Sequence, residues 1–474
     1  MDGSRTDWRA LWAGGDLGRF CFVSLGILLH ATNETMIATI MPGMVADING
    51  VELIGWSLAG YEIGSIVAGA ASGRLVSYLP LRTNMAAAAL IYALGAAMCA
   101  LAPDMRWFVV GRLVEGFGGG GLTALAFVSV ERLFERRFWP KLFAIMSVVW
   151  GVAAFGGPLI GAWITTAASW RWAFGLFCVA GLVMAAATLL VLRGAGARMP
   201  AGKAAAPAFP FFPLAVLALA ITLVASAGVA GTAALGVPML LVGLGGIVAF
   251  FALDARRPAA RLFPQRPLDP RTLLGTGLLM LGTFAVGVTP FGIYGPLLLT
   301  TLHDVPLITA GYLVAAEAVS WSLMSILVAG AKPHQERAII AAGAVMVAAA
   351  MAGLAWAIPA GSVPAVLACA LVQGGGFGLC WPFVTKLIVA AAHPEESAVA
   401  SAAVPTIQRL GYAVGAAIAG LAANYAGFSH GLSVETAAGV AHWLFAAFLP
   451  FGLVGLWAAA RMLRQNRAVS APAA

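Results

Sequence analysis

A small set of charged side chains lies inside long apolar stretches of this 474-residue chain. A charge in hydrocarbon is costly and is usually retained for substrate transport or for a proton relay. We therefore expect the functional site among these residues. They are Glu34, Glu62, Glu115, Glu317, Arg112, Lys386 and Arg409.

The acidic members of this set share one depth. At about 1.5 Å per helical residue, each lies roughly 12–14 Å from the same end of its stretch. Carboxylates gathered in one polar cavity would bind protons readily, because burial and mutual repulsion both penalise their charged form. We predict a shared cavity in which these acids and His30, one turn from Glu34, couple transport to protons. The predicted proton-coupling residues are Glu34, Glu317, Glu62, Glu115 and His30. For His30, packing in the core is the alternative.

The basic members suggest structural roles. Arg112 lies one helical turn from Glu115 and can pair with it, or it can bond to backbone carbonyls. We expect Arg409 to be structural or to act as a gate. Lys386 lies near a basic loop, and we expect its ammonium group to extend toward the membrane surface.

Aromatic and amide side chains lie at similar depths to the acids. An aromatic face can hold a planar or cationic substrate, although packing is the alternative role for each ring. The predicted substrate-binding residues are Glu34, Asn33, Tyr294, Trp321, Gln373 and Trp381.

The elements that must position these residues are membrane helices. The chain is 61% hydrophobic and 10% charged, whereas a soluble domain has about 25% charged residues. Fourteen apolar stretches approach or exceed the roughly 20 residues that a membrane-spanning helix needs. The sequence therefore predicts an all-α integral membrane protein with fourteen spans.

The 27 Lys and Arg residues fall almost entirely on one set of alternate loops. Because basic loops stay in the cytoplasm, this pattern places both termini there and explains the net charge of +8 without a nucleic-acid partner. Basic connections divide the chain into a six-helix bundle over residues 1–192, a linker with two additional helices over 193–271, and a six-helix bundle over 272–474. Residues 113–116 (LVEG) recur as residues 371–374 (LVQG), which indicates two parallel halves.

Other kinds of chemistry have little support. Residues 116–121 formally satisfy GxGxxG, but a dinucleotide site needs a preceding strand, and this run lies in mid-membrane. The five cysteines lie in apolar stretches without the spacing of metal ligands. We expect no cofactor and no enzymatic activity, with the proton gradient as the energy source.

Several motifs resemble the major facilitator superfamily. They are residues 112–118 (RLVEGFG), 156–161 (GGPLIG) and 169–174 (SWRWAF). Residues 33–42 (NETMIATIMP) and 408–411 (QRLG) resemble its fourteen-helix drug:proton antiporter branch. The resemblance implies two six-helix bundles with two extra central helices. It also implies structural or gating roles for Arg112, Gly157, Pro158, Gly161 and Arg409, and the glycine–proline motif accompanies export in the family.

One loop departs from the family pattern. Residues 73–82 (GRLVSYLPLR) carry Ser77 where the family has an acid and Pro80 where it has a second glycine. In the family this loop is thought to latch the cytoplasmic side. We therefore expect any latch in this chain to use other contacts.

The function expected from these features is proton-coupled export of small amphipathic or cationic compounds by alternating access. The protein would act as a monomer in the cell membrane, or the inner membrane if bacterial, with a small-molecule substrate, protons and lipid as its partners. A metabolite importer that works as a proton symporter is the alternative. A membrane-embedded sensor or enzyme is a more distant one, since the loops offer no catalytic set.

Overall fold

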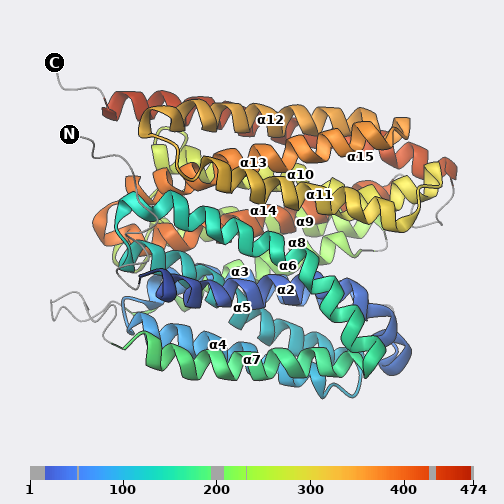
Figure 1. The fold of residues 1–474 in the computed structure, drawn as a ribbon, viewed down its shortest axis with the longest axis horizontal. Coiled ribbons are helices and arrows are strands. Elements are labelled where there is room, and N and C mark those ends of the chain that lie inside the picture. Colours follow the sequence, from blue (N-terminus) through green and yellow to red (C-terminus); the bar gives the residue numbers. More distant parts are fainter. Residues whose placement is uncertain (1–15, 51–52, 194–207, 231, 426–433, 471–474) are drawn as a thin grey trace.

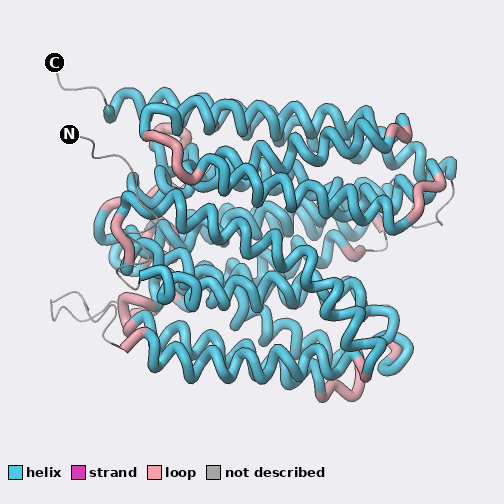
Figure 2. Tube along the Cα trace, viewed as in Figure 1, coloured by secondary structure: helices cyan, strands magenta, loops and turns pink. Residues whose placement is uncertain are grey.

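The computed structural model describes residues 16–50, 53–193, 208–230, 232–425 and 434–470. These residues form long α-helices joined by loops (Figures 1 and 2). The helices are α2 (Asp16–Ile48), α3 (Ile54–Leu75), α4 (Leu81–Ala100), α5 (Met105–Leu133), α6 (Trp139–Ala167), α7 (Trp170–Val191), α8 (Phe211–Gly228), α9 (Ala233–Ala255), α10 (Leu273–His303), α11 (Leu307–Val328), α12 (Pro333–Ala360), α13 (Val363–Ala391), α14 (Ser397–Tyr425) and α15 (Val434–Ser470). Short 3-10 turns, η2 (Arg136–Phe138), η3 (Pro258–Ala260) and η4 (Pro394–Glu396), lie in the loops.

The number of membrane spans differs from the expectation. Twelve helices of the described residues are long and apolar enough to cross a membrane. Helices α3 and α14, with 22 and 29 residues, are long enough but are not among them. Both are rich in Gly, Ala and Ser, and they carry Glu62 and Arg409, respectively, which lowers their mean hydropathy. The all-helical membrane architecture is confirmed, whereas the count of fourteen spans is not.

Two groups of helices lie side by side. In the first, α5 packs along α3 and α4, α4 packs on α7, and α2 packs on α6. In the second, α13 packs along α11 and α12, and α10 packs on α14 and α15. Figure 1 shows α4, α5 and α7 at one side of the molecule and α12, α13 and α15 at the other. The groups meet where α6 contacts α11 and where α14 contacts α3 and α5.

The same close helix crossing occurs once in each group, between α5 and α3 and between α13 and α11. Glycines of α5 press on α3 so closely that a Cβ atom would overlap backbone oxygens there, and glycines of α13 press on α11 in the same way. The matching pairs of glycine and backbone oxygen are Gly116 with Tyr61, Gly120 with Ser65, Gly374 with Glu317, and Gly378 with Trp321. The LVEG and LVQG segments thus occupy equivalent places in the two groups.

The two central helices cover the seam between the groups. Helix α8 packs on both α3 and α14, and α9 packs on α8 and α14. The approach of α8 to α14 is close, since a Cβ atom at Gly420 would lie 2.6 Å from the backbone oxygen of Gly228. The pair is therefore in contact with both halves of the chain.

The end of the molecule that carries the basic loops is closed. A Cβ atom at Gly73 of α3 would lie 2.7 Å from the Cα atom of Val399 in α14. On the other side of the molecule, Ser322 of α11 donates to the backbone oxygen of Ser147 in α6 at 3.1 Å. The two groups are thus in contact at the basic end and again beside Ser147.

The linker over residues 256–271 also joins the groups at the basic end. Arg74 of the first group donates to the backbone oxygen of Ala259. Arg261 pairs with Glu396 of the second group at 3.2 Å, and the same carboxylate accepts from the backbone N–H of Gln265 at 3.0 Å. Arg74, next to the loop that departs from the family pattern, thus contacts the linker, and the linker contacts the second group.

Candidate functional site

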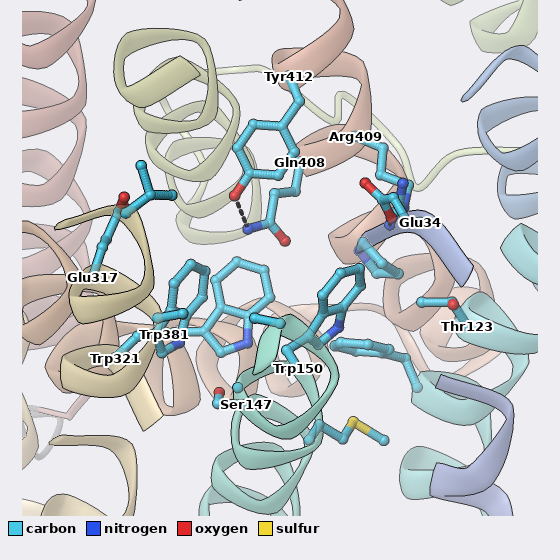
Figure 3. Close-up of a pocket in the computed structure, with 17 residues that line it drawn as sticks. Glu34, Thr123, Ser147, Trp150, Glu317, Trp321, Trp381, Gln408, Arg409 and Tyr412 are labelled. Carbon is cyan, nitrogen blue, oxygen red and sulfur yellow. Dashed lines mark hydrogen bonds and ion pairs between the residues drawn. The ribbon is translucent and has the colours of Figure 1, made fainter. Parts of the chain in front are cut away.

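A cavity of about 250 Å³ lies between the two groups of helices. Its wall is formed by side chains of α2, α5, α6, α11, α13 and α14, so neither group alone could form it. Figure 3 shows the polar and aromatic side chains around it. The principal ones are Glu34, Thr123, Ser147, Trp150, Glu317, Trp321, Trp381, Gln408, Arg409 and Tyr412.

At one end of the cavity, a single guanidinium group joins the two halves. Arg409 of α14 lies 2.7 Å from Glu34 of α2 through Nη2 and 2.8 Å from Glu62 of α3 through Nη1. Its side chain is only 9% exposed, so solvent screens the pairs weakly. Trp150 lies beside the guanidinium, with its ring centre 5.4 Å from Cζ. One positive charge thus faces two carboxylates.

His30 lies directly behind Glu34. Its Nε2 atom is 3.7 Å from Glu34 Oε2, and its Nδ1 atom is 2.6 Å from the hydroxyl group of Tyr61. The histidine is fully buried. Tyr61 and His30 therefore lie in a row behind Glu34, but within the described chain His30 Nε2 has no hydrogen-bond partner.

A second ionic cluster lies inside the first half, away from the cavity. Arg112 donates to Glu115 at 2.6 Å and to the side-chain oxygen of Asn33 at 2.5 Å, while Asn33 donates to the other oxygen of Glu115 at 2.7 Å. All three are buried, and the ring centre of Tyr61 lies 4.1 Å from Arg112 Cζ. Removal of any one of the three would therefore leave a buried polar or charged partner without its contact.

The predicted cavity of four carboxylates is therefore wrong. Glu34 and Glu317 line the cavity, Glu62 pairs with Arg409 outside the wall, and Glu115 is enclosed by Arg112 and Asn33. Asn33, predicted to bind substrate, lies outside the cavity wall and bonds Glu115 and Arg112 instead. Consecutive helical residues point about 100° apart, so Glu34 faces α14 while Asn33 faces α5.

The opposite end of the cavity holds the remaining carboxylate. Glu317 of α11 accepts a hydrogen bond from Gln373 of α13 at 2.9 Å. Among the described residues, no basic side chain pairs with Glu317. One turn along α11, Trp321 stacks on Phe377 at 4.8 Å between ring centres and meets Trp381 edge-on at 5.9 Å.

The other predicted residues occupy supporting positions. Trp321 and Trp381 line the cavity as expected, whereas Gln373 lies behind Glu317 and Tyr294 is absent from the cavity wall. Position along each helix indicated how deep in the membrane these residues lie, but not whether their side chains point into the cavity. Lys386 forms an ion pair with Glu336 in the first turn of α12, next to the basic loop that precedes this helix.

The glycine–proline segment of α6 positions the helix that carries Glu34. A Cβ atom at Gly157 would overlap the hydroxyl group of Thr35, and one at Gly161 would lie 2.5 Å from Met36 Cγ. Thr35 also donates to the backbone oxygen of Ala153 at 2.9 Å. Glycines around Pro158 thus let α6 press onto α2 next to Glu34.

Several cavity residues were missed in the sequence. Gln408 donates to Tyr412 at 2.9 Å, and both line the cavity on either side of Arg409 in sequence. Trp150 and Thr123 complete the wall from α6 and α5. Gln408 and Tyr412 lie four residues apart, on one face of α14, and this spacing beside Arg409 could have suggested them. Nothing in the sequence distinguished Thr123.

Comparisons with known proteins agree with this geometry. The sequence profile of the Major Facilitator Superfamily matches residues 23–342. A protein of Mycobacterium tuberculosis described as a probable multidrug-efflux transporter is 29% identical over 97% of this chain and 97% of its own length. Multidrug resistance protein 3 of Bacillus subtilis is 31% identical, but over only 32% of this chain and 29% of its own.

Solved structures share the fold. The human organic anion transporter MFSD10 has a TM-score of 0.64 at 16% identity, covering 93% of this chain and 98% of its own. A proton:xylose symporter has a TM-score of 0.63 at 15% identity, with 94% of each chain covered. At these identities the likeness concerns the fold alone.

Proposed function

Because this chain belongs to the Major Facilitator Superfamily, we propose that it is a proton-coupled exporter of small amphipathic or cationic compounds. In this proposal it is a member of the fourteen-helix drug:proton antiporter branch, with α3 and α14 counted among its spans. The two halves, residues 1–192 and 272–474, rock about the cavity and open it alternately to the two sides of the membrane. Both termini and the basic loops lie in the cytoplasm, as their charge favours.

The charge balance around the aromatic cavity carries the proposal. Glu34 and Glu317 line the space, Glu62 pairs with Arg409 beside it, and Arg409 is the one basic side chain of the wall among the described residues. In a site of low dielectric, such an excess of negative charge favours the uptake of a cation or of protons. The tryptophan rings on the wall suit the apolar part of an amphipathic compound.

The contact between the halves suggests how protons would drive the cycle. While Glu34 and Glu62 are ionised, Arg409 holds α14 against α2 and α3. A proton taken up by Glu34 neutralises one of these pairs and weakens the hold. We propose that this loss lets the halves change their relative orientation, with His30 passing the proton to Glu34.

The mycobacterial relative supports the direction of transport. It matches over almost its whole length and is described as a probable multidrug-efflux transporter. The glycine–proline segment that packs α6 on α2 favours export as well. No contact in the cavity favours the importer over the exporter.

Flux in proteoliposomes tests the proposal. Purified protein is reconstituted with a pH-sensitive dye inside the vesicles, and cationic dyes, antibiotics and hydrophilic metabolites are supplied under an imposed proton gradient. We expect protons to move opposite to at least one lipophilic cation, with no such movement in protein-free vesicles. Movement of protons in the same direction as a metabolite, with no response to the cations, would overturn export in favour of uptake.

A further inference from the structure

One face of α15 changes from apolar to basic near the end of the helix. Leu453, Trp457, Arg461 and Arg464 follow one another at intervals of three or four residues, so they share one side of the helix. All four side chains are exposed, whereas Met462 is buried next to α10. This face therefore points away from the helix bundle, toward the surrounding lipid.

The length of α15 places the two arginines at the headgroup layer. The helix has 37 residues, which span about 55 Å, whereas the hydrocarbon core of a bilayer is about 30 Å thick. The apolar span starts at Ala437, and Trp457 lies about 30 Å further along the helix, where tryptophans meet the headgroups. Arg461 and Arg464 lie about 6 Å and about 10 Å beyond Trp457. In Figure 1 the last turns of α15, in red, extend past the start of α12.

The charges of these two arginines are not neutralised by the protein. Other basic side chains at this end form ion pairs, as Lys386 does with Glu336. No carboxylate in the described part of the chain lies within ion-pair distance of Arg461 or Arg464. Arg461 instead donates to the backbone oxygen of Pro270, and its Cζ atom lies 5.7 Å from the ring centre of Trp457. Both guanidinium groups can therefore receive an external anion.

The linker before α10 brings a third arginine to the same place. Pro270, whose carbonyl group accepts from α15, is followed by the exposed Arg271. The preceding residue, Asp269, is already engaged, since its carboxylate lies 3.6 Å from Arg266 and accepts from the backbone N–H of Arg271 at 2.8 Å. The end of α15 and the linker thus form a basic surface next to the apolar face.

We propose that Arg271, Arg461 and Arg464 bind the phosphate group of an anionic phospholipid, in the leaflet on the side of the basic loops. Guanidinium groups suit a phosphate because each offers parallel N–H donors. The acyl chains of this lipid lie along Leu453 and Trp457. These exposed apolar residues favour a lipid over a soluble phosphate, which would make no contact with them. This inference does not depend on what the protein transports.

Native mass spectrometry of the full-length protein tests this inference. Wild type and a variant labelled with heavy nitrogen are mixed in one detergent sample, and phosphatidylglycerol or phosphatidylcholine is added. The fraction of each protein that carries lipid gives the two affinities. Wild type is expected to prefer phosphatidylglycerol. Arg464→Gln should bind it roughly 5-fold more weakly, and the double variant Arg461→Gln/Arg464→Gln roughly 30-fold more weakly.

Two further variants serve as controls. Arg137→Gln also removes an exposed arginine from the basic loops, but one that is paired with Glu135, and we expect it to bind lipid as wild type does. Arg464→Lys keeps the charge and should retain most of the affinity. Arg464 makes no contact that holds the described fold together, so its variants are expected to fold.

Three outcomes would overturn the inference. They are equal binding of the two lipids by wild type, unchanged binding in the double variant, and a loss in Arg137→Gln as large as that in Arg464→Gln. Soluble glycerol phosphate provides the last comparison, because it has the headgroup chemistry without acyl chains. If it binds as tightly as phosphatidylglycerol, the site belongs to a soluble phosphate and the lipid assignment is wrong.

Discussion

Arg409 and Glu34 face each other across the interface between the two halves, with Nη2 and Oε2 2.7 Å apart. They are 375 residues apart in the chain. This ion pair joins α14 to α2, and Glu34 also lines the cavity. A change in the charge of either residue therefore weakens the contact between the two halves.

Glu34→Gln is expected to abolish proton-coupled export while leaving folded protein in the membrane. The amide cannot take up a proton, and Glu62 still offers Arg409 a carboxylate. The measurement is the vesicle flux assay, with size-exclusion chromatography as the check on folding. Wild-type flux of both proton and substrate in this variant would contradict the proposed role of Glu34 in proton coupling.

Arg409→Gln is expected to destabilise the protein, because Glu34 and Glu62 then face each other without a cation. Adding Glu62→Gln should restore part of the loss, since one of the two acids is removed. Thermal unfolding of the two single variants and the double variant forms a cycle, for which we expect a coupling of about 0.5–3 kcal/mol. Strictly additive effects would mean that the Arg409–Glu62 pair contributes nothing to the fold.

Arg112→Ala is expected to cost about 3–5 kcal/mol, because it leaves the buried Glu115 without its cation. The matched control is Arg137→Ala, whose partner Glu135 is 67% exposed, and about 0–1 kcal/mol is expected there. Chemical denaturation in detergent compares the two. A loss no larger than that of the control would contradict the structural role given to Arg112.

Gly374→Ala is expected to push α13 away from α11 and to lower both stability and substrate binding. A Cβ atom there would overlap the backbone oxygen of Glu317, and overpacking costs about 1–3 kcal/mol or more. Gly245→Ala in α9 is the control, since its Cβ atom would meet nothing within 4 Å. We expect that control to be neutral or slightly stabilising. Equal melting temperatures for the two variants would argue against the close crossing.

Glu396→Ala is expected to loosen the closed basic end, because it releases both Arg261 and the backbone N–H of Gln265. A reporter cysteine, Val399→Cys, lies against Gly73 at the closed seam. With the five native cysteines replaced by alanine, its rate of maleimide labelling measures the opening of that seam.

The neighbouring exposed residue supplies the control for this experiment. Glu395→Ala removes a carboxylate from the same 3-10 turn. In this variant we expect Val399→Cys to react with maleimide at the same rate as in the protein that keeps both Glu395 and Glu396. Faster labelling in Glu396→Ala alone would support a latch made by the linker. Identical rates in both variants would show that the linker does not hold the basic end closed.

The sequence by itself was enough to identify the helices and the residues worth examining. Long apolar stretches require helices in a membrane, because every backbone polar group must be satisfied within the segment. The cost of buried charge marked Glu34, Glu317 and Arg409 as functional or structural centres. The repeated LVEG and LVQG segments predicted two parallel halves, and the structure places both segments at the same kind of helix crossing.

Only the tertiary structure decided which charges meet. Position along a helix gives depth in the membrane, but direction changes by about 100° with each residue. Position along the helices correctly indicated that the four acids have similar depths. The angle around each helix axis, which the sequence does not give, determines that Glu115 pairs with Arg112 and Glu34 with Arg409. The partner of Glu34 comes from the opposite half of the chain, and local sequence carries no information about such a contact. Its energy depends on how whole helices pack, which is a property of the assembled fold.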